Sequence, residues 1–375
     1  MDYHEEGSPF GDTLAVFTET STEEDPLDIL HAGLDLSRKK LDVCLLSSEG
    51  EHLDQLAVPP DVDSLRTFAR RVDEVHGEHV CAVVESMTGA RLVHDTLEAE
   101  GWSVEIADAQ KVKGLAPLAC KTDKIDSMVL AVLSHRDLVP GIWLPDPRVR
   151  EKRELARFRM HLVKHKSALK NRVHSTMINF GRPCPVTDLF GAEGRRLLAK
   201  LDVPEPWRGN VSASIELIDD LERQISDINC RLREGHADHP YVPLLLSVPG
   251  IGRVLAFTIA AEIGEIERFS SPEKFAGYTG LCPRVNQSGE KDRRGPLTKH
   301  GPTYLRWALL EATMHALRHP AYAARYRRTK KRLGKQRGAK VAQVDIARRL
   351  AHAIWHMPTR NEKFAPRGAA LRLAA

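Results

Sequence analysis

The chain has 375 residues, a length that suggests two or three domains rather than one compact core. It carries 55 Lys and Arg against 51 Asp and Glu, and this net charge of +4 points to no particular partner. The charge is nevertheless sorted along the sequence. The first 30 residues contain nine acids and no Lys or Arg, whereas the last 85 contain 21 bases and four acids. A basic block of this kind is typical of a solvated surface or of one that binds a polyanion.

The composition excludes several classes of protein. No run approaches the roughly 18 to 20 apolar residues that a membrane span requires. The acidic start lacks the basic and apolar segments of a secretory signal. The cysteines never come closer together than 37 positions, which excludes a local zinc motif. We therefore expect a cytoplasmic protein with reduced thiols and no membrane partner.

The first region predicts a mixed α/β domain over residues 30–147, after an acidic tail (1–29) that we expect to be disordered. Three short apolar segments in quick succession indicate an antiparallel meander. Strands and helices then alternate, which is typical of a mixed sheet. The expected strands are 31–36, 40–47, 52–58, 79–85 and 103–107, and the expected helices are 63–75, 89–100 and 121–135.

The second region, residues 148–240, predicts a helical coiled-coil arm. Apolar residues recur at spacings of three, four and seven from Leu155 to Met177 and again from Ile215 to Leu232, with a Pro- and Gly-containing break over 181–209. Two such helices could pack as an antiparallel stalk. The same pattern also fits the core of an ordinary helical bundle.

The third region, residues 241–375, predicts a mostly helical domain that opens with a helix-hairpin-helix. In LLLSVPGIGRVLAFTIAAEI, Gly250 and Gly252 lie in a turn between two apolar segments. Glycines at such a turn let backbone N–H groups approach a phosphate, and the following helix N-terminus favours an anion. We therefore interpret the turn as a candidate DNA-backbone contact. A tight corner between helices, without any ligand, is the alternative.

Four acids form a candidate metal site. Asp35 and Glu85 each lie in an otherwise apolar strand, where an unpaired carboxylate would be costly to bury. Asp123 and Asp126 are three residues apart at the start of a helix, so they share a face. Four convergent carboxylates could hold two Mg²⁺ ions, a common device for activating an attacking oxygen and stabilising a leaving one on phosphate. Alternatively, Asp123 is a helix N-cap and Asp126 a favourable first-turn charge.

Ser288 is the last serine of the sequence and lies in a Gly-rich, basic stretch, residues 277–306, that we expect to form a loop. Its hydroxyl would need activation from elsewhere, because no His–Asp relay lies near it. A turn serine without chemistry is the alternative. The surrounding bases could bind phosphates and stabilise charge in phosphoryl transfer. They are Arg284, Lys291, Arg293, Arg294, Lys299 and Arg306.

Together these motifs resemble one known family. Asp35, Glu85 and Asp123-Lys124-Ile125-Asp126, followed by VPGIG and GLCPRVNQSGEKDRRGPLTKHGPTYLR, look like the DEDD transposases of the insertion-sequence one-ten family, over about residues 30–320. The resemblance implies an N-terminal domain with the ribonuclease H-like fold of the junction resolvase RuvC. It also implies a C-terminal transposase domain whose catalytic serine corresponds to Ser288.

The resemblance implies a function as well. Family members recombine double-stranded DNA, both element ends and target, under the guidance of a structured noncoding bridge RNA. Mg²⁺ at the four acids would activate Ser288 of a neighbouring protomer, giving a phosphoserine link that strand exchange reverses. The implied assembly is a homodimer or homotetramer, and the implied location is the nucleoid.

This chain departs from the family pattern in two respects. Many members have two serines before the glycine, whereas only Ser288 precedes Gly289 here, and neither the acidic tail nor the end beyond about Arg325 has a recognised counterpart. Three alternatives remain open: a RuvC-like junction nuclease that uses metal-activated water, a nuclease-dead nucleic-acid-binding protein, and an actin-like ATPase. The ATPase would need a second Gly-rich phosphate loop, which the sequence lacks.

Overall fold

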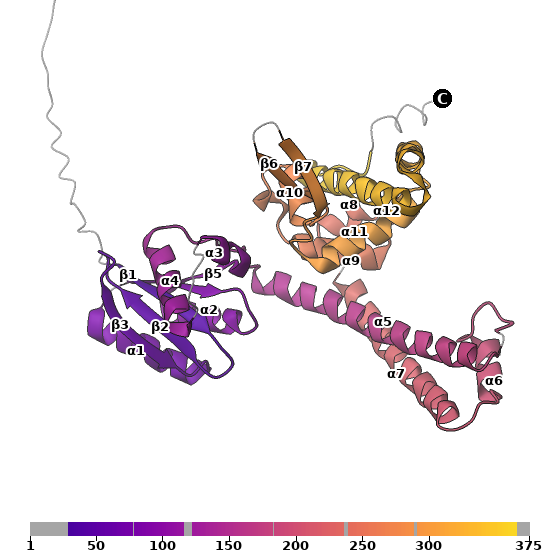
Figure 1. Ribbon diagram of the computed structural model, residues 1–375, viewed down its shortest axis with the longest axis horizontal. Coiled ribbons are helices and arrows are strands. Elements are labelled where there is room, and N and C mark those ends of the chain that lie inside the picture. Colours follow the sequence, from indigo (N-terminus) through magenta and orange to yellow (C-terminus); the bar gives the residue numbers. More distant parts are fainter. Residues whose placement is uncertain are drawn as a thin grey trace, which may run out of the picture. The chain divides into compact units, whose positions relative to one another are not determined.

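The computed structural model divides the chain into two compact units, Met1–Leu144 and Pro145–Ala375, which we describe separately (Figure 1). It describes residues 29–77, 79–115, 122–182, 184–235, 239–288 and 291–365. The predicted acidic tail, apart from Ile29, therefore lies outside the described residues, as do the last ten residues of the basic end.

A five-stranded mixed sheet in the order β3-β2-β1-β4-β5 forms the centre of the N-terminal unit. The first three strands pair antiparallel, as the predicted meander requires, whereas β4 and β5 continue the sheet parallel to β1. This confirms the predicted mixed α/β region. The strands are β1 (Ile29–Leu36), β2 (Leu41–Leu46), β3 (His52–Val58), β4 (His79–Glu85) and β5 (Ser103–Ala107).

Helices cover both faces of this sheet. Helices α1 (Val62–His76) and α2 (Ala90–Ala99) share one apolar core with the alternate residues Leu30, Ala32, Leu34 and Leu36 of β1. On the opposite face, α4 (Asp123–His135) packs against β1, β2 and β4. Helix α3 (Ala109–Leu115) was not predicted, because it is one short segment with a single buried residue and therefore shows no apolar periodicity.

The contact between α4 and β1 is made at Gly33. A Cβ atom at this position would lie 1.8 Å from the carbonyl oxygen of Ser127 and 2.4 Å from the backbone nitrogen of Ala131. Only glycine allows the helix backbone to lie this close to the strand. Asp35 is two residues further along β1, so its side chain projects from the face that α4 covers.

Polar contacts hold α4 in place along its length. Near its end, Ser134 Oγ donates to the carbonyl oxygen of Cys81 (3.2 Å) and hydrogen-bonds His31 Nδ1 (2.9 Å), which ties the helix to β4 and β1. At its start, Gln55 Nε2 of β3 donates to the carbonyl oxygen of Lys124 (3.0 Å). The first turn of α4, where two of the predicted site acids lie, is therefore positioned by the sheet.

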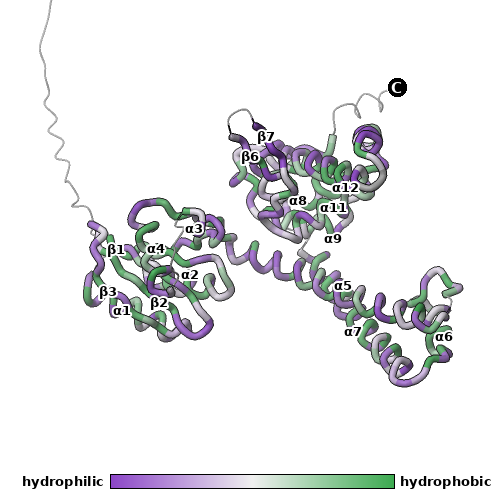
Figure 2. Tube along the Cα trace, in the orientation of Figure 1, coloured by the Kyte–Doolittle hydropathy of each residue, from purple (hydrophilic) through white to green (hydrophobic). Residues whose placement is uncertain are grey.

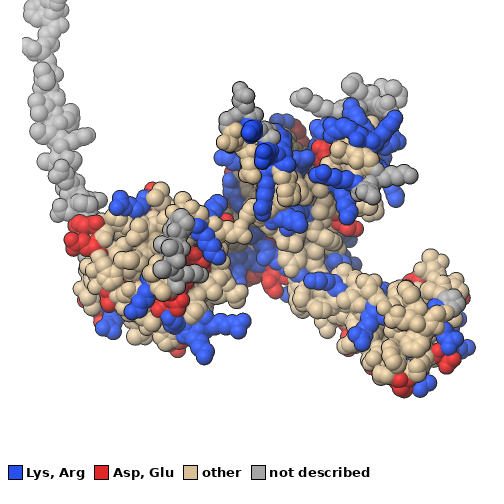
Figure 3. Space-filling model, viewed as in Figure 1, with Lys and Arg blue, Asp and Glu red and all other residues tan. Residues whose placement is uncertain are grey.

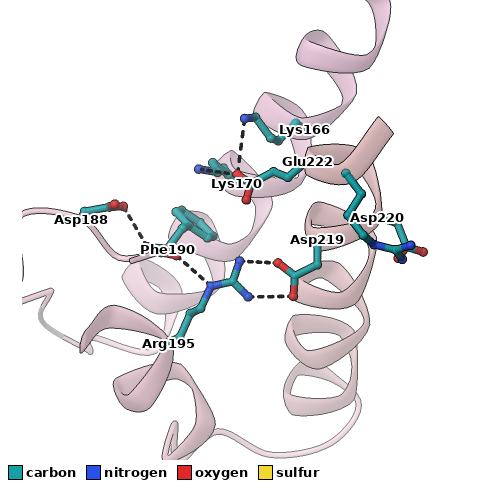
Figure 4. A network of polar contacts seen from close by, with 9 residues as sticks. Lys166, Lys170, Asp188, Phe190, Arg195, Asp219, Asp220 and Glu222 are labelled. Carbon is teal, nitrogen blue, oxygen red and sulfur yellow. Dashed lines mark hydrogen bonds and ion pairs between the residues drawn. The ribbon is translucent and has the colours of Figure 1, made fainter. Parts of the chain in front are cut away.

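The second unit begins with two long helices, α5 (Pro147–Asn179) and α7 (Trp207–Glu234), which pack side by side along the chain's apolar seams (Figure 1). The predicted break between them contains a short helix, α6 (Ala192–Ala199). Figure 4 shows how α6 is tied to α7: Arg195 makes a bidentate ion pair with Asp219 and donates to the carbonyl oxygen of Phe190 (2.8 Å). Lys166 and Lys170 of α5 reach Glu222 of α7.

The remainder of the second unit is mostly helical, as predicted. One prediction is wrong: the stretch 277–306 is not simply a loop, because residues 283–288 and 291–297 pair as two antiparallel strands, which we call the serine hairpin. No helix among the described residues is both long and apolar enough to cross a bilayer. The elements are α8 (Tyr241–Leu245), α9 (Arg253–Ile263), η1 (Ile266–Arg268), α10 (Pro272–Tyr278), β6 (Pro283–Ser288), β7 (Lys291–Leu297), α11 (Thr303–Ala316) and α12 (Pro320–Arg360).

A buried ion pair joins α5 to this helical region. Glu262 of α9 is completely buried and accepts two hydrogen bonds from the Arg157 guanidinium (2.7 and 2.9 Å). Arg153, one turn earlier, donates to the carbonyl oxygens of Ala261 and Glu262 (both 2.7 Å). Glu262 is buried whereas Arg157 is partly exposed, so loss of the arginine would leave the buried carboxylate without its charge partner.

We predict that Gly33→Ala destabilises the full-length protein, because the added methyl group has no room between β1 and α4. Overpacking of this kind costs about 1 to 3 kcal/mol. Urea unfolding followed by circular dichroism measures the change. The control is Gly114→Ala in α3, where an added Cβ meets no atom within 4 Å and alanine is the better helix former. Equal stability of the two variants would contradict the proposed role of Gly33.

Candidate active site

Three carboxylates form a row across neighbouring strands on the face that α4 covers. Asp35 of β1 lies directly opposite Asp42 of β2 in the antiparallel register. Glu85 of β4 follows Val84, the parallel partner of Leu34, and so lies beside Asp35 at the same end of the strands. Side chains alternate along a strand, so all three acids project toward the face of α4.

The first turn of α4 brings two more acids to this end of the sheet. Its N-cap is Thr122, whose hydroxyl accepts from the backbone N–H of Ile125 (3.4 Å), so the alternative reading of Asp123 as the N-cap is wrong. Asp123 and Asp126 are both first-turn residues, where the partial positive charge of the helix N-terminus favours acids. The helix therefore supplies two carboxylates to the region where the sheet supplies three.

The electrostatics confirm that these groups lie close enough to interact. The pKa of Asp35 is raised from 3.8 to about 6, first by burial and then by the negative charges of Asp126, Asp123, Glu85 and Asp42. The four acids predicted from the sequence are thus brought together, along with a fifth, Asp42. The like charges make this cluster unfavourable unless a cation neutralises it.

One such cation is built into the site. Lys40 Nζ lies 2.8 Å from Asp42 Oδ2 and 2.8 Å from Asp123 Oδ2, so it bridges β2 and α4. Its hydrogen bonds to these two carboxylates raise the pKa of the lysine, which keeps it charged. Asp42 is only 6% exposed, and its Oδ1 accepts the hydrogen bond from Lys40 (3.1 Å).

Sequence reasoning missed both Asp42 and Lys40, although a signal was present. Asp42 is the only acid in the otherwise apolar strand LDVCLL, the same feature that singled out Asp35. Its position opposite Asp35 depends on the register of a hairpin, which strand prediction does not specify. Lys40 gives no local sign of its role, because its partner Asp123 is 83 residues further along the chain.

The donor set fits a hard divalent cation by its chemistry. All five groups are carboxylates, and Mg²⁺ prefers oxygen ligands. Within the described ranges, however, no three Asp, Glu, His or Cys side chains are arranged so that they could hold an ion as they stand. The carboxylates share one end of the sheet, and binding an ion would require side-chain rearrangement, including release of Asp123 by Lys40.

Ser288 is the last residue of β6 and is exposed at the end of the hairpin, directly opposite Lys291 of β7 (Figure 1). Asn286 is opposite Arg293. Since alternate residues share a face, Ser288 and Asn286 lie on the same side of the hairpin as Lys291 and Arg293. Two bases of β7 thus lie on the same side of the hairpin as the hydroxyl, and the hairpin is hydrophilic along much of its length (Figure 2).

The other predicted nucleic-acid residues divide into two groups. Arg284, Lys299 and the hairpin base Arg294 are exposed, in a unit where blue side chains gather over β6 and β7 (Figure 3). Arg306 is half-buried and donates to the carbonyl oxygens of Lys299 (3.2 Å) and Thr279 (3.4 Å). Its guanidinium therefore supports the chain next to the hairpin.

The two glycines of the predicted phosphate turn have different surroundings. Gly250 has φ +90°, and a Cβ there would lie 2.5 Å from the carbonyl oxygen of Ala312, so this glycine is required for close packing against α11. That contact matches the alternative reading, a tight corner between helices. Gly252 is exposed at the N-terminus of α9 with no atom near its missing side chain. The phosphate contact stays a prediction for both glycines, of which Gly252 is the more exposed.

Two family models match the chain. Residues 32–180, which include the carboxylate cluster, match a model described as Transposase, DEDD_Tnp_IS110. Residues 242–328, which include the serine hairpin, match a model described as the Transposase IS116/IS110/IS902 family. The matches cover both units and fall on the segments that carry the candidate site residues.

The chain is also similar to curated bacterial proteins. It is 25% identical to the probable family 20 transposase of Pseudomonas aeruginosa, over 66% of this chain and 74% of that one. It is 25% identical to the transposase for insertion sequence element IS1111A of Coxiella burnetii, over 76% and 79%, and 24% identical to that for IS1328 of Yersinia enterocolitica, over 75% and 84%. The chain therefore belongs to the IS110 family of insertion-sequence transposases, enzymes that recombine DNA.

Proposed function

We propose that the chain catalyses Mg²⁺-dependent DNA strand cleavage and exchange through a phosphoserine intermediate. The observation that carries this proposal is the carboxylate cluster where β1 and β4 end and β2 and α4 begin, in which burial and the neighbouring acids raise the pKa of Asp35. Such a concentration of negative charge is typical of a site that binds divalent cations. The sheet order, with an antiparallel meander followed by two parallel strands, supports a ribonuclease H-like fold for this unit.

Asp35, Glu85, Asp123 and Asp126 are the proposed ligands of two Mg²⁺ ions. When bound, these ions would polarise the attacking and leaving oxygens of a phosphodiester. Asp42 takes a different role: it is buried and holds Lys40 beside Asp123, so that the lysine neutralises this carboxylate until an ion binds.

Ser288 is the proposed nucleophile. Its Oγ bonds to the phosphorus of the scissile phosphodiester while the bond from that phosphorus to a sugar oxygen breaks. The departing oxygen takes up the proton that the serine loses. Lys291 and Arg293, on the same face of the hairpin, balance the charge of the phosphate. The free hydroxyl of another strand then reverses the step, so the reaction needs no high-energy cofactor.

The acids and the serine belong to different units of the chain. In the proposed enzyme they come from two protomers of a homodimer or homotetramer. The partners are double-stranded DNA, as element ends and as target, and a noncoding bridge RNA that pairs with both. The resemblance noted above is the support for the RNA and for the assembly.

A junction nuclease that activates water is the second candidate function. It would use the same acids and would leave Ser288 without a chemical role. The hairpin favours the serine mechanism, because it exposes the hydroxyl beside two bases of the neighbouring strand. A nuclease-dead binding protein is disfavoured, since it would have no reason to keep five carboxylates together against their mutual repulsion.

We predict that Ser288→Ala lowers the rate of strand exchange by at least about a thousandfold, as expected for loss of a nucleophile. DNA binding should stay within a few-fold of wild type. With Mg²⁺ and a labelled DNA end, the wild-type protein should form a covalent adduct that mass spectrometry maps to Ser288. Gln287→Ala, the neighbour on the other face of the hairpin, is the control. Cleavage by Ser288→Ala would favour the junction nuclease instead.

Mixing inactive variants tests whether two protomers share one site. Neither Ser288→Ala nor Asp126→Ala alone should form the adduct. A mixture should, because Asp126 of the first variant can serve Ser288 of the second. If the mixture stays inactive while the two variants are shown to assemble together, the acids and the serine of a site come from the same protomer.

We predict that Asp35→Asn raises the unfolding temperature of the metal-free protein at neutral pH. The folded state binds the proton of Asp35 more tightly than the unfolded state, so wild-type stability falls as the pH rises from 3.8 to about 6. The amide removes this cost. Differential scanning fluorimetry in EDTA and then in Mg²⁺ is the measurement. Mg²⁺ should stabilise wild type and the exposed-acid control Glu51→Gln, but not Asp35→Asn.

The proposed guidance by a bridge RNA can be tested separately. Protein purified after expression together with the DNA that flanks its coding region should retain a discrete noncoding transcript from that DNA. Sequencing of the bound RNA is the measurement, with the flanking DNA replaced by unrelated sequence as the control. Efficient recombination by protein freed of RNA would contradict guidance by RNA while leaving the serine mechanism intact.

A further inference from the structure

A second basic surface lies on α12, apart from the serine hairpin. The helix is interrupted at Gly334, which has φ 78° and ψ 177°, so its two parts form a helical hairpin. Gly338 lies against the other part: a Cβ there would be 2.5 Å from the carbonyl oxygen of Lys330. Arg325 and Asp345 form an ion pair across the same hairpin (2.6 Å). We call residues 327–340 the basic tip.

The basic tip concentrates positive charge without compensation. It contains eight Lys and Arg and no acid. Arg325, which lies just outside the tip, is the base that Asp345 neutralises. None of the tip bases whose side chains the structure describes, which excludes Lys335, forms an ion pair, and Lys330 lies over the Tyr326 ring (5.9 Å). In Figure 3, blue side chains cover this end of the unit.

Four of these bases lie on one side of the first helical part. Arg327 and Arg328 are followed one turn later, about 6 Å along the axis, by Lys331 and Arg332. All four are exposed. A two-by-two group of exposed bases on a helix held by a glycine contact presents its charge as a fixed surface.

The chemistry of the tip favours a phosphate backbone over nucleic-acid bases. Residues 327–340 include no Phe, Tyr or Trp on which an unpaired base could stack. A stacked or splayed single strand is therefore a poor fit. Lys and Arg alone fit a duplex, where the phosphates are outside and the bases are paired.

We propose that the basic tip of α12 is a second duplex DNA-binding surface, which contacts the phosphate backbone without reading sequence. The match to the transposase family model ends at residue 328, so most of the tip lies beyond it. The surface is independent of the serine mechanism, because it requires neither Ser288 nor the carboxylate cluster. Its role is to add affinity for the DNA on which the family acts.

The test is a binding titration of the full-length protein on duplex DNA in EDTA, where strand cleavage is off, at several salt concentrations. The tip variant replaces Arg327, Arg328, Lys331 and Arg332 by Ala. The slope of log K against log salt is negative, and each lost phosphate contact should reduce its magnitude by about 0.9. We expect the magnitude of the slope to fall by about two to four, and the affinity at low salt to fall by about tenfold or more.

The control variant removes the same number of bases from α7, a helix that also carries six acids. It replaces Arg208, Arg223, Arg231 and Arg233 by Ala. Its slope should stay at the wild-type value. An equal loss in both variants would show a general charge effect and overturn the proposal, as would an unchanged slope for the tip variant.

Two further measurements keep the proposal specific. The same titration on duplex RNA separates the two kinds of duplex, and a loss confined to RNA would overturn the assignment to DNA. Gly338→Ala changes no charge but forces the two parts of α12 apart. It should weaken DNA binding several-fold with the remaining helical content retained; wild-type affinity would show that the tip does not act as a built surface.

Discussion

The close contact between β1 and α4 at Gly33 is the constraint on which the N-terminal site depends. A strand and a helix can approach this closely only where no side chain separates their backbones, and Ser127 and Ala131 occupy the space where a Cβ would lie. The contact brings the first turn of α4 over the end of β1. Two acids of the helix thereby meet three acids of the sheet, although the helix begins 38 residues after β4 ends.

The resulting cluster of carboxylates is electrostatically unfavourable, because it holds like charges close together. Burial and four neighbouring charges oppose ionisation of Asp35, and a single lysine offsets part of the repulsion. Three acids elsewhere in the described chain are paired: Asp219, Glu262 and Asp345 each accept hydrogen bonds from an arginine. This contrast is typical of a protein whose scaffold is electrostatically satisfied while its reactive centre is held in a less stable arrangement.

The C-terminal unit sorts its bases in the same way. Arg153 and Arg157 of α5 donate hydrogen bonds to α9 and so join the two helices. Arg306 supports the chain beside the serine hairpin. Lys291, Arg293 and the basic tip remain on the surface. The overall charge of +4 therefore adds up structural bases, surface bases and clustered acids. It gives no information about any one of these groups.

The amino-acid sequence by itself determined the strands, the long helices, the chemical type of the site and the transposase resemblance, because these depend on local periodicity and on motif residues that keep their order along the chain. Three of the five strands begin and end where expected. The strands of the serine hairpin were not predicted, because their residues are mostly polar and exposed and show no apolar alternation. Only the tertiary structure decided that Asp42 faces Asp35, that Lys40 reaches Asp123, that Gly250 packs against α11, and that Gly338 closes the basic tip. Each of these contacts joins segments through strand register or backbone approach, and neither property is written in the spacing of residues along a single element.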